Sequence, residues 1–338
     1  MHFDRPIGGF FELELPPRQP GNLLEYWQAE PSDCRWYGNA RSALMQLLQT
    51  RQIRRTWLPA YLCDAVIDAA LESGCRILFY PVDHHLQPDS AWLSSRLDSG
   101  DAVLAVDYFG RPPNAAFLSL VNSRPDIDWI EDRAHAIDTG MAPWGTWQLF
   151  SPRKLAGVPD GGLLIGPQLS CLPATQGVPH LHASAWMRRE DCTGHRHAEW
   201  VARHQQDEAS MDIGPRPVSK LTQHMLACMP ASPLLIARKQ NYARYQVALP
   251  YMSFLGDVQS YAPFGFVVRT QHADDLWRHL IDQRIFAQRH WRDISAPVEQ
   301  FPVAHQLSNE LLTLPCDHRL TNADVDRVIA AVQIFFDE

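Results

Sequence analysis

Long apolar runs and a surplus of basic charge are both lacking in this sequence. No stretch of its 338 residues reaches the ~20 apolar residues needed to span a bilayer. The formal net charge is −8, whereas proteins that bind nucleic acid normally carry a basic surface. The first residues also lack the basic segment and apolar run of a secretory signal. We therefore expect a cytoplasmic protein with no membrane or nucleic-acid partner.

Closely spaced cysteine pairs are lacking as well. The cysteines are odd in number and scattered, with no CxxC pair: Cys34, Cys63, Cys75, Cys171, Cys192, Cys228 and Cys316. A disulfide framework is typical of small secreted chains with regularly spaced pairs, which this chain does not resemble. The pattern predicts reduced thiols, as in the cytosol.

Two common catalytic signatures are absent from the sequence. It contains no HExxH motif for zinc and no GxSxG elbow for a serine hydrolase. Its clustered histidines are adjacent or two residues apart: His84 and His85, His180 and His182, and His195 and His197. Metal sites need a fuller ligand set than this. We expect solvated loop histidines and no metal.

The length and composition indicate a globular protein with one large and one small domain. Hydrophobic residues make up 46% of the chain and charged residues 20%, which is ordinary for a folded protein. Several prolines near the start predict a surface arm over residues 1–33. The pattern of apolar runs and helical segments changes near residue 235. This change predicts a large domain over residues 34–234 and a small C-terminal domain over residues 235–338.

Short apolar runs alternate with helical segments through the large domain. The expected strands are Arg55–Leu58, Arg76–Val82, Ala102–Tyr108, Asp128–Ile130, Trp147–Phe150 and Gly162–Ile165. The expected helices are Ser42–Gln49, Asp64–Glu72, Ser90–Leu97 and Ala115–Val121. Such alternation predicts an α/β fold with a mostly parallel sheet, whose site lies beyond the carboxyl ends of the strands.

The second half of the chain has a different pattern. The polar segment Pro173–Pro217 interrupts the alternation and is expected to be an excursion or a dimer element. The small domain is expected to be α+β, with helices over Leu234–Ala248, Ala273–Gln283 and Asn322–Phe336 and a strand over Phe264–Arg269.

Three segments carry candidate chemistry, and each has a structural alternative. In IEDRAHAID, Asp132 ends a strand and could face a ligand or cap a helix. In FSPRKLAGVPDGG, Lys154 follows a strand and precedes a Gly-Gly pair, although a lone lysine is usually a surface residue. In YGNARSALMQLL, a small-residue turn precedes a helix and could hold a phosphate, or Asn39 or Ser42 could cap the helix.

The order of these segments resembles the DegT-like family of sugar aminotransferases. That order is a phosphate-type turn, a strand, LPAYLCDAV, further βα units, a strand-end aspartate, and a lysine before Gly-Gly. Three more segments are similar to the family: GGFFELELP (Gly8–Pro16), VDYFGRP (Val106–Pro112) and LTLPCDHRLTNADVDRVI (Leu312–Ile329). The resemblance implies a fold-type I, pyridoxal-phosphate (PLP) enzyme.

The resemblance also implies a role for individual residues. Lys154 matches the lysine that carries PLP covalently and moves protons, and Asp132 matches the aspartate on the pyridine nitrogen. His135 matches the residue near the 3-oxygen of the ring. Residues that match the phosphate-binding positions are Ala40, Arg41, Ser42 and Ser151.

The sequence departs from the family pattern in three places. Two residues fewer than usual separate Ser151 from the lysine. Cys63 stands where many members stack an aromatic ring on the cofactor, and Tyr61 is two residues away. The motif that reaches a neighbouring subunit has no clear counterpart, so Arg216 or Ser219 is a candidate substitute.

By resemblance, the function is transfer of an amino group from glutamate to a nucleotide-linked keto sugar, for lipopolysaccharide, another surface polysaccharide or a natural product. We expect a homodimer with its site near the interface. One alternative is a sugar dehydratase of the same fold, against which Lys154 argues because that branch has histidine at this position. Another alternative is a non-catalytic PLP-fold binding protein.

Overall fold

The computed structural model describes residues 16–28, 33–172, 175, 178, 183–191 and 193–337. The family-like segment Gly8–Pro16, apart from Pro16, and the pair His180/His182 lie outside the described residues.

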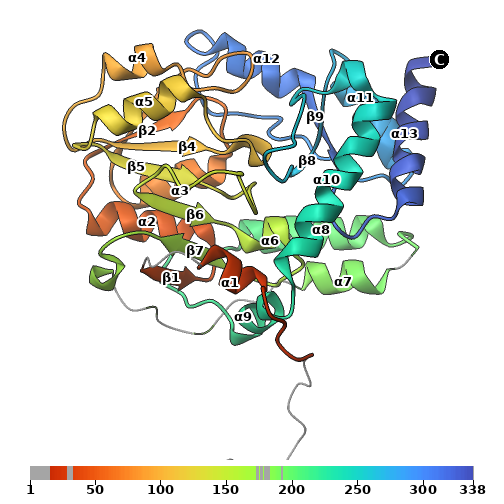
Figure 1. The fold of residues 1–338 in the computed structure, drawn as a ribbon, viewed down its shortest axis with the longest axis horizontal. Helices are drawn as coiled ribbons and strands as arrows, with labels where there is room; N and C mark the ends of the chain where they lie inside the picture. The colour runs from red at the N-terminus through yellow and green to blue at the C-terminus, as the bar shows by residue number, and fades with distance from the viewer. Residues whose placement is uncertain are drawn as a thin grey trace, which may run out of the picture.

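A seven-stranded mixed sheet forms the larger part of the molecule (Figure 1). Its strands, in spatial order, are β1 (Cys34–Tyr37), β7 (Gly162–Ile165), β6 (Trp147–Phe150), β5 (Asp128–Asp132), β4 (Ala102–Val106), β2 (Arg55–Pro59) and β3 (Arg76–Tyr80). The strands from β6 to β3 pair in parallel, and β7 is antiparallel to both β6 and β1. The expected α/β class with a mostly parallel sheet is confirmed.

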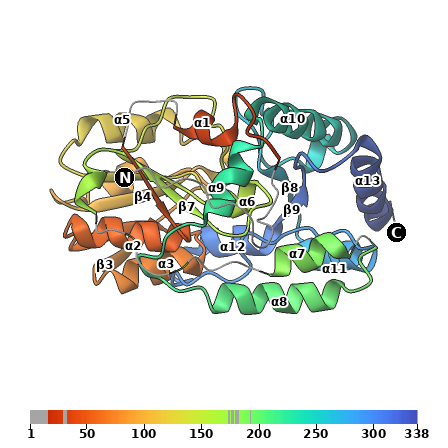
Figure 2. The same cartoon turned by 90° about the horizontal axis from the view of Figure 1, so that it is seen from below.

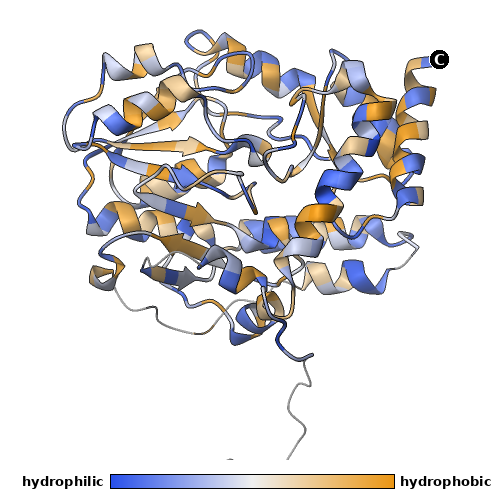
Figure 3. Cartoon of the chain, viewed as in Figure 1, coloured by the Kyte–Doolittle hydropathy of each residue, from blue (hydrophilic) through white to orange (hydrophobic). Residues whose placement is uncertain are grey.

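Helices cover both faces of this sheet, which explains why its strands are apolar runs. Figure 2 shows α2 (Ala40–Thr50) and α3 (Asp64–Glu72) on one face and α5 (Ala115–Ser123) on the other. All five residues of β4 are buried, and this strand is largely hydrophobic in Figure 3. A strand buried on both faces cannot alternate apolar and polar residues. Asn39 and Asn114 cap α2 and α5 through their side chains.

A two-stranded antiparallel sheet and its helices form the smaller part. Strand β8 (Gly265–Arg269) pairs with β9 (Leu311–Pro315). The helices of this part are α10 (Ala231–Ala248), α11 (Ala273–Asp282), α12 (Pro302–Glu310) and α13 (Asn322–Asp337). The expected boundary near residue 235 falls inside α10 and remains a prediction.

Several element boundaries differ from the sequence-based expectation. Strand β3 ends at Tyr80 rather than Val82, and α4 (Ser90–Ser94) ends three residues before Leu97. Strand β5 continues to Asp132, so the two acids lie within the strand. Strands β1 and β9 and helix α12 were not expected. Strand β1 (CRWY) lies at the edge of the sheet, and Tyr37 is its one buried residue. Its four residues therefore do not form the apolar run that marks a central strand.

The connecting segments contain more helices than expected. They are α1 (Leu23–Trp27), α6 (Pro152–Leu155), α7 (Ser184–Glu190), α8 (His197–Ala209) and α9 (Lys220–Ala227), with short 3-10 turns at Tyr108–Gly110, Leu169–Cys171 and Pro250–Met252. The expectation of a surface arm is wrong for α1. Leu23 and Trp27 are buried and pack with β7 and α9 in a small hydrophobic cluster, because α1 carries apolar residues on one side.

Candidate functional site

The carboxyl ends of the parallel strands bring the candidate residues together. Strands β4, β5 and β6 all run toward the small part of the molecule (Figure 1). Tyr108 follows β4, Asp132 ends β5, and Lys154 follows β6 on α6. Neighbouring parallel strands end at the same edge of a sheet. Residues far apart in the sequence therefore meet there.

Lys154 lies on a one-turn helix that is held from both sides. Pro152 begins α6, where a missing backbone N–H costs nothing, and the Lys154 backbone N–H donates to the Ser151 carbonyl at 3.0 Å. Arg238, buried on α10, donates to the carbonyls of Leu155 at 3.1 Å and Phe264 at 3.0 Å. Lys154 itself is exposed. Its position is thus fixed by buried neighbours while its amine can reach solvent.

Asp132 is the buried acid of the site. One of its carboxylate oxygens accepts a hydrogen bond from the Ala134 backbone N–H at 2.9 Å. Residues 133–146 form turns rather than a helix, so the helix-cap alternative does not apply. Burial raises the pKa of Asp132, and the positive charge of Lys154 opposes that rise. The aspartate is therefore a buried carboxyl group with a cation near it.

His135 is buried next to this pair and is held by ring contacts. Its imidazole stacks on Phe264, with ring centroids 4.4 Å apart, and on Trp291 at 5.4 Å. Neither ring nitrogen has a hydrogen-bond partner among the described residues. Burial, followed by the charges of Lys154 and His290, lowers the pKa of His135 well below its usual value. The ring is therefore neutral and offers one donor and one acceptor.

The small part contributes three side chains that the sequence did not identify as site residues: Phe264, His290 and Trp291. The Trp291 ring lies 5.8 Å from the Lys154 Nζ and 5.6 Å from the Tyr61 ring. Burial and the Lys154 charge lower the pKa of His290 to about 3. In the sequence, the adjacent aromatic residues of QRHWRD are the one feature that marks His290 and Trp291. They belong to no expected helix or strand, so the sequence gives no reason to place them at the site.

Contacts between the two parts explain how Phe264 reaches the site. The Phe264 backbone N–H donates to the Phe109 carbonyl at 2.8 Å. At Gly110, where φ is +93°, a Cβ would lie 2.5 Å from the Ala262 carbonyl oxygen. Only glycine accommodates this approach. The turn after β4 therefore fixes the segment before β8 against His135.

Tyr61 and Cys63, the two candidates for a ring contact, lie in different places. Tyr61 is buried, and its ring contacts the rings of Tyr108 at 5.8 Å and Trp291 at 5.6 Å. Cys63 is half-buried and stands at the N-terminal cap of α3. We use "aromatic cluster" for Tyr61, Tyr108, His135, Phe264 and Trp291. Tyr61 belongs to this cluster.

The Gly-Gly pair after Lys154 holds the start of α2 against the sheet. The Gly161 backbone N–H donates to the Gly38 carbonyl at 2.7 Å. A Cβ on Gly162 would lie 2.2 Å from the Asn39 carbonyl carbon, so no other residue fits without moving α2. The Asn39 side chain accepts from the Ser42 backbone N–H at 2.8 Å, which confirms the cap alternative for Asn39.

The expected phosphate-binding residues surround this helix start. Ser42 is fully buried, and its hydroxyl accepts from the Gly214 backbone N–H at 3.1 Å. Ser151 is buried before α6. Arg41 pairs with Glu208 at 3.1 Å. Ala40 is the first residue of α2. The turn is therefore next to Lys154 in space but is covered by the segment around residue 210.

The two candidate substitutes for the missing interface motif differ in exposure. Ser219 is buried and bonds Asp160 through both its backbone N–H and its hydroxyl, each at 2.7 Å. It also caps α9 by accepting from the Thr222 backbone N–H. Ser219 is therefore a structural residue, contrary to its suggested interface role. Arg216 is partly exposed, with 41% of its side chain accessible, and pairs with Asp212 at 2.7 Å.

These residues fit PLP in kind. An amine, a buried carboxyl group and an unpartnered neutral imidazole converge beside a helix start. The amine can hold the carbonyl carbon of PLP, the carboxyl group can hold its ring nitrogen, and the imidazole can hold its ring oxygen. The helix start can hold the phosphate. The fit rests on the two ring nitrogens of His135, which have no hydrogen-bond partner in the described part of the chain.

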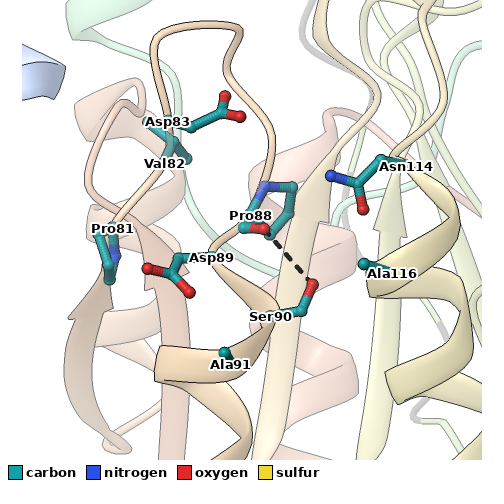
Figure 4. A pocket seen from close by; sticks show the side chains of 9 residues that line it. All are labelled: Pro81, Val82, Asp83, Pro88, Asp89, Ser90, Ala91, Asn114 and Ala116. Atoms are coloured by element: carbon teal, nitrogen blue, oxygen red, sulfur yellow. Dashed lines mark hydrogen bonds between the residues drawn. The ribbon is translucent and has the colours of Figure 1, made fainter.

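Other features of the described residues offer less. Figure 4 shows a surface hollow beyond the end of β3, lined by Pro81, Val82, Asp83, Pro88, Asp89, Ser90, Ala91, Asn114 and Ala116. No group of three or more His, Cys, Asp or Glu side chains suited to a metal occurs among the residues described. Within the same part of the chain, no helix is long and apolar enough to cross a membrane.

Comparison with known proteins identifies the fold. No family model and no curated protein matches the sequence. Solved structures do match, among them DesV from S. venezuelae in complex with a ketimine intermediate, with a TM-score of 0.71 and 18% identity over 96% of this chain and 90% of that chain. A DegT DnrJ EryC1 StrS aminotransferase from Brucella abortus has a TM-score of 0.67 and 18% identity over 93% and 88%.

A third match is the sugar aminotransferase CalS13 from Micromonospora echinospora, with a TM-score of 0.64 and 13% identity over 94% of this chain and 98% of that chain. Similarity at these identities reports on the fold. The chain has the fold-type I architecture of the DegT/DnrJ/EryC1/StrS aminotransferases along nearly its whole length.

Proposed function

We propose that the protein is a PLP-dependent aminotransferase that moves an amino group from glutamate to a nucleotide-linked keto sugar. The convergence of Lys154, Asp132 and His135 at the ends of β5 and β6 carries this proposal. The match to CalS13, named as a sugar aminotransferase, supports the substrate class. The product would serve lipopolysaccharide, another surface polysaccharide or a natural product.

When bound, PLP supplies an electron sink for the carbanion that forms at the amine-bearing carbon. Lys154 would hold the cofactor through its amine and, once released, move the proton to and from that carbon. Asp132 would keep a proton on the ring nitrogen. Its burial makes this favourable, because a buried carboxylate gains much from a cationic partner.

The aromatic cluster would exclude water and fix the ring plane. His135 would donate to the ring oxygen from one nitrogen, since its burial keeps the imidazole neutral. Stacking on Phe264 and Trp291 fixes the orientation of that imidazole. Tyr61 would support Trp291 from the side of β2.

Absorbance in the near-visible range tests this function. The purified protein incubated with PLP should develop a band from the covalently held cofactor, and glutamate should bleach it. A keto sugar nucleotide should then restore the band. A protein that binds PLP but does not respond to any amino donor would refute transamination and favour a non-catalytic role.

We also propose that the protein works as a homodimer in the cytoplasm. Trp186 on α7 is 62% exposed, and such exposed aromatic residues favour contact with a partner. Trp200 on α8 does not contribute, because it is buried against Phe286 of the same chain with ring centroids 5.1 Å apart. The described cysteines are free thiols, which suits a reducing compartment. Light scattering at micromolar concentration should give twice the chain mass, and an active monomer would contradict a shared site.

A further inference from the structure

Two arginines from separate elements converge on one carboxylate beside the start of α2. Arg41 pairs with Glu208 at 3.1 Å and Arg153 pairs with it at 2.7 Å. The arginine side chains are only 16% and 17% exposed, whereas the Glu208 side chain is 36% exposed. Arg153 directly precedes Lys154. The cationic pair therefore links the first turn of α2 to α6, the helix that carries Lys154, and Glu208 is the most exposed of the three side chains.

One carboxylate does not neutralise this pair. Two guanidinium groups and one carboxylate leave a net charge of +1. The Nε of Arg153 is buried and has no hydrogen-bond partner among the described residues. Although burial alone would raise the pKa of Glu208, the charges of Arg153 and Arg41 lower it. A phosphate monoester, with a charge of about −1.5 to −2 and three acceptor oxygens, satisfies two arginines better than a carboxylate does.

The chain that follows Glu208 covers the rest of the helix start. The Asn39 side chain donates to the Asp212 carbonyl at 3.0 Å, and the Ser42 hydroxyl accepts from the Gly214 N–H at 3.1 Å. The segment 208–214 thus occupies both the charged and the neutral phosphate-binding groups. Its acid and its backbone take the contacts that an anionic ligand would make.

We propose that Arg41 and Arg153 form a clamp for the phosphate group of the cofactor, and that Glu208 occupies this clamp until the phosphate displaces it. This inference rests on the proposed function. It adds Arg153 to the phosphate-binding residues and gives Glu208 the role of an internal competitor. Affinity for a phosphate-bearing ligand is then lower than the clamp alone would provide.

The variant Glu208→Gln tests this competition. Loss of two partly buried ion pairs corresponds to roughly a tenfold change in an equilibrium constant. We expect E208Q to bind PLP and inorganic phosphate about tenfold more tightly than the original protein, measured by absorbance titration and by calorimetry. Binding of pyridoxal, which lacks the phosphate, should not change. Arg153→Gln should weaken binding of both phosphate ligands.

The matched control is Asp212→Asn. It removes the same charge four residues away, but Asp212 is exposed and its partner Arg216 is outside the clamp. D212N should leave the affinities unchanged. If E208Q binds phosphate no more tightly than D212N does, the competition is refuted. If the phosphate results hold but no variant attaches PLP or pyridoxal to Lys154, the clamp stands and the proposed aminotransferase function fails.

Discussion

Replacing Asp132 with asparagine tests whether the role of its carboxylate is catalytic or structural. Asparagine has the same shape and can still accept from the Ala134 N–H, which Asp132 binds at 2.9 Å. It cannot hold a proton on a ring nitrogen. Because burial raises the pKa of Asp132, the cofactor-free protein should be at least as stable after the change.

The expected loss of activity follows from the burial of this carboxylate. Removing one partner of a fully buried charge pair costs about 3–5 kcal/mol. At about 1.4 kcal/mol for each tenfold change in rate, the half-reaction should slow by roughly two to four orders of magnitude. The assay is stopped-flow absorbance of the PLP-loaded variant mixed with glutamate.

Asp128→Asn provides the control for Asp132→Asn. Asp128 is the first residue of the same strand, at the end opposite to Asp132, and it pairs with Arg51 at 3.2 Å. Its replacement should leave the half-reaction unchanged. A D132N protein that reacts at nearly the original rate would show that Asp132 only shapes the turn after β5.

Two further changes test the scaffold of the site. Gly162→Ala should destabilise the protein and weaken PLP binding together, because its Cβ would lie 2.2 Å from the Asn39 backbone; thermal unfolding that is unchanged would contradict this packing. Burial, followed by the charge of Glu131, raises the pKa of Asp107 well above its usual value, so the folded state favours neutral Asp107. The stability that protonated Asp107 contributes is complete below the pKa of Asp107 in the unfolded state. Above that pKa the contribution declines by up to about 1.4 kcal/mol per pH unit. Asp107→Asn should therefore gain stability relative to the original protein as the pH rises above about 4, and a pH-independent difference in urea unfolding would refute this.

The large sheet and the residues at its strand ends could be predicted from the sequence. Strands β6 and β7 and helix α3 have the expected bounds. Every residue of these two strands is buried, and strands buried on both faces are apolar runs that the sequence shows clearly. The order of motifs placed Asp132 and Lys154 at neighbouring strand ends. Their proximity follows from parallel pairing alone.

The residues from the small part could not be predicted in the same way. His290 and Trp291 follow α11 in irregular chain, so no periodicity marks the side that faces the site. Their position depends on Arg238 and on the turn at Gly110, which join the two parts through backbone carbonyls. Glu208 lies on α8, whose largely polar sequence predicts an ordinary surface helix. Only the folded chain shows that it reaches Arg41 and Arg153.

Identification of the lysine that carries the cofactor tests the central claim most directly. The PLP-loaded protein is reduced with borohydride, digested and mapped by mass spectrometry, with Lys154→Ala treated in parallel. We predict a pyridoxyl group on Lys154, no attachment in K154A, and an unchanged fold, because this side chain is exposed and its helix is held by Arg238 and Pro152. A pyridoxyl group on Lys220 or Lys239, or full attachment in K154A, would contradict the account.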